Sequence, residues 1–181
     1  LVFSFTLQGF DSSVLTHLAV GTSLATIVFT SIQSVRAHHK RGAVRWAVFA
    51  WMTVGILVGA GVGSLTASYI AGPYLQKIIG VFAILVALQM AFDLRPKASG
   101  TVPRRPGLIA AGVVIGWASA IFGIGGGSLT VPFLTWRSLT MQQAVATSSA
   151  CGFPIAVASA LSFMILGWHD PLLPPHSLGF V

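Results

Sequence analysis

The sequence predicts an all-α protein, a polytopic transmembrane helical bundle with two related repeats and a glycine-broken helical hairpin. Three observations lead to this fold class. Hydrophobic residues make up 55% of the 181 residues and charged residues only 7%, which a water-soluble domain does not tolerate. Apolar stretches of about 20 residues, the length that crosses a bilayer, recur between short basic segments. A glycine-rich run interrupts one of these stretches.

Four apolar stretches are continuous enough to be membrane spans, and a fifth is broken. The continuous ones are Leu15 to Val35, Trp46 to Ile70, Leu75 to Phe92 and Ala144 to Trp168. The broken one is Gly107 to Thr135, which contains the glycine-rich run. A short Ala-Gly-Pro turn separates the second and third spans.

The spans divide the sequence into two parts. Residues 1–94 contain three spans and are expected to be the end of a first repeat. Residues 95–106 form a proline-containing cytoplasmic linker, and residues 107–181 begin a second repeat with the broken hairpin and one span. The chain starts in an apolar run at Leu1 and stops in another, so we expect a fragment that is truncated at both ends.

Basic residues predict the orientation of the spans. They fall mainly in two segments on the same side of the predicted bundle: Arg36, Lys40, Arg41 and Arg45, then Arg95, Lys97, Arg104 and Arg105. Loops rich in Lys and Arg remain in the cytoplasm, so both segments are assigned there. This distribution accounts for the net charge of +7 without a nucleic-acid partner and makes the lipid bilayer the expected environment.

Two of the spans carry related segments. Ala19 to Ala25 has the sequence AVGTSLA, and Ala144 to Ala150 has the sequence AVATSSA. Internal duplication of this kind is typical of secondary transporters. It places two Thr-Ser pairs at matching depths in two membrane spans: Thr22 and Ser23, and Thr147 and Ser148.

The relative direction of the two copies depends on the path of Gly107 to Thr135. If this stretch folds back at its glycines, Arg137 joins the cytoplasmic loops and the copies are inverted repeats. If it crosses the membrane completely, the copies are parallel and the tail after Trp168, which has no Lys or Arg, is cytoplasmic. The positive-inside rule favours the inverted arrangement.

The run Gly123-Ile124-Gly125-Gly126-Gly127-Ser128 is the sharpest local signal. Consecutive glycines expose backbone N–H groups, and a helix that restarts after them directs its positive end at the midplane, where it attracts an anion. A tight helix crossing or a hinge explains the glycines alone equally well, but the duplicated Thr-Ser pairs favour a ligand. The candidate substrate-binding residues are Gly125, Gly126, Gly127, Thr130, Pro132, Thr147, Ser148, Thr22 and Ser23.

Ordinary structural roles compete with these assignments. The hydroxyls of the Thr-Ser pairs and of Ser149 can bond to carbonyls of their own helices. Pro132 and Pro154 can simply kink a helix. Glycines at four-residue spacing, Gly55, Gly59 and Gly63, are explained by close packing between helices.

Motifs for other functions are missing from the sequence. Ser128 stands where a G-x-G-x-x-G fingerprint requires glycine, and no Gly-Lys-Ser or Gly-Lys-Thr follows a glycine run, which argues against nucleotide binding. No serine lies in a G-x-S-x-G context and no histidine lies deep in a span, so we do not expect an enzyme. With a single cysteine, Cys151, and with His38, His39, His169 and His176 in a loop or in the tail, we expect neither a metal nor a cofactor.

The segments Gly123 to Leu134, Ala144 to Ser149 and Ala19 to Ala25 resemble the sulfite exporter TauE/SafE family of membrane permeases. The resemblance covers nearly the whole chain and implies a bacterial inner-membrane protein of about eight spans in two related halves. It implies a small anion such as sulfite or a sulfonate as the substrate. An inside-negative membrane potential makes export of such an anion easier to explain than import.

A second hypothesis is a non-transporting membrane scaffold or assembly factor. In that case the glycines and small residues only pack helices, and the protein moves no anion. The sequence leaves a homo-oligomer open.

Overall fold

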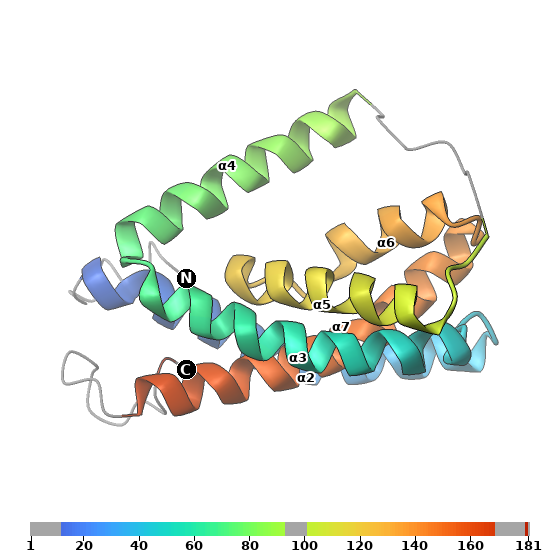
Figure 1. Cartoon of the computed structure of the whole chain (residues 1–181), viewed down its shortest axis with the longest axis horizontal. Helices are drawn as coiled ribbons and strands as arrows, with labels where there is room; N and C mark the ends of the chain where they lie inside the picture. Colours follow the sequence, from blue (N-terminus) through green and yellow to red (C-terminus); the bar gives the residue numbers. More distant parts are fainter. Residues whose placement is uncertain (1–11, 93–100, 169–179, 181) are drawn as a thin grey trace.

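The computed structural model describes residues 12–92, 101–168 and 180, which form helices joined by short loops (Figure 1). The helices are α2 (Ser12–Lys40), α3 (Trp46–Tyr69), α4 (Gly72–Ala91), α5 (Arg105–Phe122), α6 (Gly127–Trp136) and α7 (Met141–Gly167). All of them except α6 are long and apolar enough to cross a membrane. The described residues contain no strand, so the predicted all-α fold is confirmed.

Helix boundaries differ from the prediction where basic residues or prolines begin or end a span. α2 continues to Lys40 through a segment predicted as loop, because basic side chains in its last turn interact favourably with the negative end of the helix dipole. α5 begins at Arg105, inside the predicted linker, because Pro106 fits the first turn of a helix. Residues 95–100 of that linker lie outside the described part of the chain.

The two helices that carry the related segments, α2 and α7, run antiparallel and side by side (Figure 1). Near the start of α2, the ring of His17 lies 5.3 Å from that of Phe180, which also contacts Phe163 near the end of α7. At the opposite end, Arg45 N donates a hydrogen bond of 3.0 Å to Thr147 Oγ1. Inverted repeats require that the two related helices run antiparallel, as α2 and α7 do. The repeat relationship itself stays a prediction.

Glycines bring the backbones of α3 and α5 into direct contact. A Cβ atom on Gly59 would lie 2.8 Å from Val113 Cα, and one on Gly112 would lie 3.2 Å from Ile56 N. Such distances leave no room for any side chain, so the small residues allow the two helices to approach closely along their length. The predicted packing role of the α3 glycines is confirmed.

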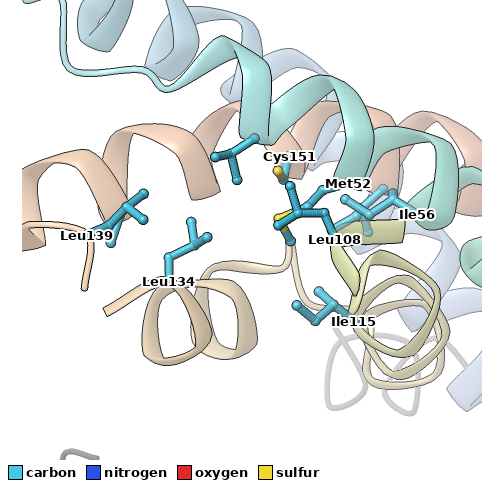
Figure 2. Packing of buried hydrophobic residues seen from close by; sticks show 10 residues of the cluster. Met52, Ile56, Leu108, Ile115, Leu134, Leu139 and Cys151 are labelled. Carbon is cyan, nitrogen blue, oxygen red and sulfur yellow. The ribbon is translucent and has the colours of Figure 1, made fainter. Parts of the chain in front are cut away.

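An apolar cluster ties the short helix α6 to the bundle. Figure 2 shows buried side chains of α3, α5, α6, α7 and the loop before α7 meeting there, including Met52, Ile56, Leu108, Ile115, Leu134, Leu139 and Cys151. α4 differs from the other helices because it diverges from the bundle and exposes most of its apolar side chains (Figure 1). This exposed surface is suited to contact with lipid.

Nearly all described Lys and Arg residues gather at one end of the bundle, which we call the basic end. Lys77, near the start of α4, is the exception. The loops that precede α3, α5 and α7 meet at the basic end, and one cavity there is lined by Arg45, Val102 and Ser138. The predicted clustering is therefore present, and its assignment to the cytoplasm stays a prediction. The residues of the basic end are Arg36, Lys40, Arg41, Arg45, Arg104, Arg105 and Arg137.

Candidate functional site

The chain reverses direction between α5 and α6, in a segment that we call the glycine loop (residues 123–127). Gly123 ends α5 with a φ of 65°, and Gly126 precedes α6 with a φ of 77°. Both values lie in the left-handed region, which other residues adopt only with strain. The glycines thus allow the sharp return of α6 toward the basic end, and the predicted glycine-broken hairpin is confirmed (Figure 1).

The glycine loop lies halfway through the bundle. It contacts α2 near its middle, where Ser23 Oγ donates to Gly123 O at 3.4 Å. It contacts α7 near its middle, where a Cβ on Gly152 would lie 2.8 Å from Gly125 O. α6 has ten residues and is therefore about 15 Å long, half the thickness of a bilayer core. Irregular backbone at this depth is stable only where protein or a polar cavity surrounds it.

Several N–H groups at the glycine loop have no hydrogen-bond partner in the part of the chain that the structure describes. Gly126 N donates to Ile124 O at 2.7 Å, and Thr130 N donates to Gly126 O at 2.8 Å. Within the described residues, no acceptor faces the N–H groups of Gly125, Gly127 and Ser128. Unpaired donors at the positive end of a helix form a site that attracts an anion.

A cavity of about 410 Å³, which we call the groove, opens beside these donors. It is bounded by α2, α7 and the first turn of α6, and no charged side chain lines it. Its volume accommodates a small oxyanion with several water molecules, since one water occupies about 30 Å³ in the liquid. Its lining residues are Ile27, Thr30, Ser31, Ser34, Gly125, Gly127, Val131, Val145, Ser148, Ser149 and Gly152.

Ser148 differs from three other hydroxyl residues that line the groove. Thr30, Ser31 and Ser149 each donate to a carbonyl of their own helix, as hydroxyls in membrane helices commonly do. Ser148 Oγ has no partner among the described residues, although its side chain is only 2% exposed. It lies 3.9 Å from the position that a Cβ on Gly127 would occupy. Its hydroxyl is therefore free to bond a ligand beside the unpaired N–H groups.

Two more buried hydroxyls without described partners lie close to Gly126. A Cβ on Gly126 would be 3.5 Å from Thr130 Oγ1 and 3.8 Å from Ser119 Oγ. An unsatisfied buried hydroxyl is costly in a protein interior. The unpaired hydroxyls of Ser119, Thr130 and Ser148 thus concentrate around one short backbone segment, which marks it as polar within an apolar bundle.

The structure brings together some of the predicted site residues. Gly125, Gly127 and Ser148 line the groove, and Gly126 and Thr130 lie directly next to it.

Other predicted residues face elsewhere. Pro132 lies inside α6 but does not line the groove, and Thr147 accepts the hydrogen bond from Arg45 N. Ser23 lines a separate cavity of about 260 Å³ together with Gly123 and Gln76, and its neighbour Thr22 lines neither cavity.

Thr22 and Ser23 on α2 were predicted as site residues from the sequence, but the face of this helix that lines the groove was not. A usable signal existed, because Ile27, Thr30, Ser31 and Ser34 have the spacing i, i+3, i+4, i+7 that places residues on one helix face. The groove-lining residues of α7 have the same spacing: Val145, Ser148, Ser149 and Gly152. No comparable spacing in the sequence indicated that Ser119 lies near the site.

These features define a class of protein: a multi-pass helical membrane protein with a glycine-broken hairpin at mid-depth. The family profile described as Sulfite exporter TauE/SafE matches residues 1–180. The chain belongs to this family. Its curated relatives carry the name of probable membrane transporter proteins.

Two relatives illustrate the match. A "Probable membrane transporter protein" of Haemophilus influenzae is 32% identical over 100% of this chain and 69% of its own length. The "Probable membrane transporter protein MJ0441" of Methanocaldococcus jannaschii is 34% identical over 82% of this chain and 55% of its own length. No solved structure matches the chain significantly.

Proposed function

We propose that the protein is a permease that moves small oxyanions, such as sulfite or organic sulfonates, across the inner cell membrane in the outward direction. One observation carries this proposal: the N–H groups of Gly125 and Gly127 and the hydroxyl of Ser148, all unpaired within the described residues, belong to residues that line one groove halfway through the bundle. The family description supports a sulfur oxyanion as cargo. The groove and the residues around it are the proposed binding site.

The chemistry of the groove suits an anion that must be released again. Sulfite and sulfonate oxygens accept several hydrogen bonds, and neutral N–H and O–H donors can replace part of their hydration shell. Because no Lys, Arg or His lines the groove, bound anion forms no ion pair that would hold it tightly. Transport requires binding that is strong enough to admit the anion and weak enough to let it leave.

The membrane potential favours outward transport of an anion. An inside-negative potential contributes about 2.3 kcal/mol for each elementary charge per 100 mV. A monovalent anion that enters the groove from the cytoplasm is therefore driven outward without a coupling ion. Import of the same anion would need an additional energy source.

Removal of the Ser148 hydroxyl tests the proposed site. We expect Ser148→Ala to lower sulfite efflux from liposomes containing the purified protein by about tenfold, because a hydrogen bond to a charged ligand contributes roughly 1.5–3 kcal/mol. Ser162→Ala is the matched control, because Ser162 lies on the same helix outside the groove and its Oγ donates to Ala158 O at 2.8 Å. The control should retain efflux within about twofold.

Each result separates the hypotheses. Equal loss in the two variants, or no loss in Ser148→Ala, would contradict the assignment of Ser148 to the binding site. The absence of flux from the unmodified protein with both sulfite and methanesulfonate would instead support the scaffold hypothesis. The glycine contacts between α3 and α5 are expected in a scaffold as well as in a permease. Unpaired polar groups beside a groove are expected only where a ligand binds.

A further inference from the structure

A second cavity lies at the basic end of the bundle and adjoins the groove. Its volume is about 400 Å³, and we call it the vestibule. Val145 lines both the vestibule and the groove, so the two cavities are neighbours along the first turns of α7. The residues lining the vestibule are His38, Arg41, Ala43, Met141, Gln142 and Val145.

The α2 side of the vestibule continues the polar face of the groove. Thr30, Ser34 and His38 follow one another at a spacing of four residues, which keeps them on one side of α2. Arg41, in the turn directly after the helix, lines the vestibule together with His38. The hydroxyls of the groove are thus followed, toward the basic end, by an imidazole and a guanidinium. A polar path leads along α2 from Arg41 to the glycine loop.

The positive charge in the vestibule is not neutralised by the described part of the chain. Residues 12–92 and 101–168 contain no Asp and the whole sequence contains no Glu. Other cations of the basic end add to the potential at this opening, and apolar walls focus it. Arg36 and Lys40 lie close in sequence but do not line the vestibule. Position, rather than charge alone, therefore distinguishes Arg41 from its neighbours.

We propose that the vestibule is the initial binding site for the transported anion, where His38 and Arg41 collect a small oxyanion before it passes Val145 into the groove. This inference rests on the proposed function for the identity of the anion. The expected ligand chemistry is a compact oxyanion with a negative charge. A lipid phosphate shares this chemistry, so the experiment must separate the two sources.

A cysteine in the groove can report the potential created by the vestibule. Ser34→Cys, made in a Cys151→Ala background, is labelled with an anionic and with a cationic methanethiosulfonate reagent, and the ratio of the two rates is measured. We expect Arg41→Gln to lower the anionic-to-cationic ratio by about fivefold, because it removes a nearby unit charge. Lys40→Gln is the matched control and should change the ratio by less than about twofold. Equal effects of the two substitutions would overturn the proposal.

Protection by an added anion identifies the source of the ligand. In detergent without anionic lipid, methanesulfonate should slow anionic labelling of Ser34→Cys, and Arg41→Gln should raise the half-protecting concentration by about fivefold. Arg41→Lys should keep most of the protection. Protection by phosphatidylglycerol but not by methanesulfonate would assign the vestibule to a lipid headgroup and overturn the proposal.

These measurements do not depend on transport. If the labelling ratio and the protection follow Arg41 but the protein carries no sulfite or methanesulfonate in liposomes, the vestibule stands as an anion site and the proposed permease function is wrong. If flux is present and the ratio is insensitive to Arg41, the permease function stands and the vestibule proposal is wrong.

Discussion

Replacing Gly59 with leucine is expected to lower the free energy of unfolding by about 3 kcal/mol or more, because α3 and α5 could no longer touch. A Cβ on Gly59 would meet the backbone of Val113, with both Cα and C at 2.8 Å. Backbone atoms in the middle of a helix cannot rotate away as the end of a side chain can. The whole interface would have to open to admit the leucine. The midpoint of thermal unfolding is measured in detergent by circular dichroism.

Gly61→Leu provides the control for this experiment. Gly61 lies on the same helix, and nothing lies within 4 Å of the position that its Cβ would occupy. The substitution adds the same apolar volume to the same helix but on a side where no other described residue is in contact, so the midpoint should change by only a few degrees. Similar losses in the two variants would show that helix propensity or insertion, rather than the α3–α5 contact, limits stability.

The spans and the helix packing could be predicted because their signals are local. Twenty apolar residues between charges predict a span whatever surrounds them, and the spacing of Gly55, Gly59 and Gly63 marks one face of one helix. The partner of that face was not predictable. α5 packs against this face of α3 because its own glycines, including Gly112, lie opposite α3 backbone atoms. Only the folded chain shows this pairing.

The site was harder to predict because neighbouring residues on a helix face different directions. Thr147 and Ser148 are adjacent and chemically similar, yet one accepts a hydrogen bond from Arg45 N and the other lies at the groove with a free hydroxyl. The sequence cannot separate the two, since about 100° of rotation per residue decides which of them faces the cavity. Tertiary packing of α7 against α2 sets that rotation.

The duplication suggests matching roles for Ser23 and Ser148, and the structure places the two side chains at different cavities. Ser148 lines the groove, and Ser23 lines the separate cavity next to Gly123. The related segments nevertheless place Val20 and Ser23 in that cavity at the positions that Val145 and Ser148 occupy in the groove. Two cavities lined by corresponding residues on either side of the glycine loop agree with the inverted repeats that the sequence predicts.

Gly127→Val is expected to lower sulfite efflux by about tenfold or more while leaving the bundle folded, because apolar branches narrow a path that ions must cross with their water. Gly127 is the first residue of α6 and lines the groove, and the nearest atom to its Cβ position is Ser148 Oγ at 3.9 Å. Valine therefore fits without a clash, and its methyl groups occupy the groove beside the unpaired N–H groups. Efflux from liposomes and the thermal unfolding midpoint are measured together.

Gly80→Val is the matched control for the groove, because Gly80 lies on α4 with nothing within 4 Å of its Cβ position. Both variants add the same side chain to a helix, but only the one at residue 127 adds it to the proposed path. Efflux from the control should stay within about twofold of the unmodified protein. If Gly127→Val folds normally and also keeps its efflux, the anion does not pass between α6 and α7, since two methyl groups beside Ser148 would obstruct any ion that crosses there.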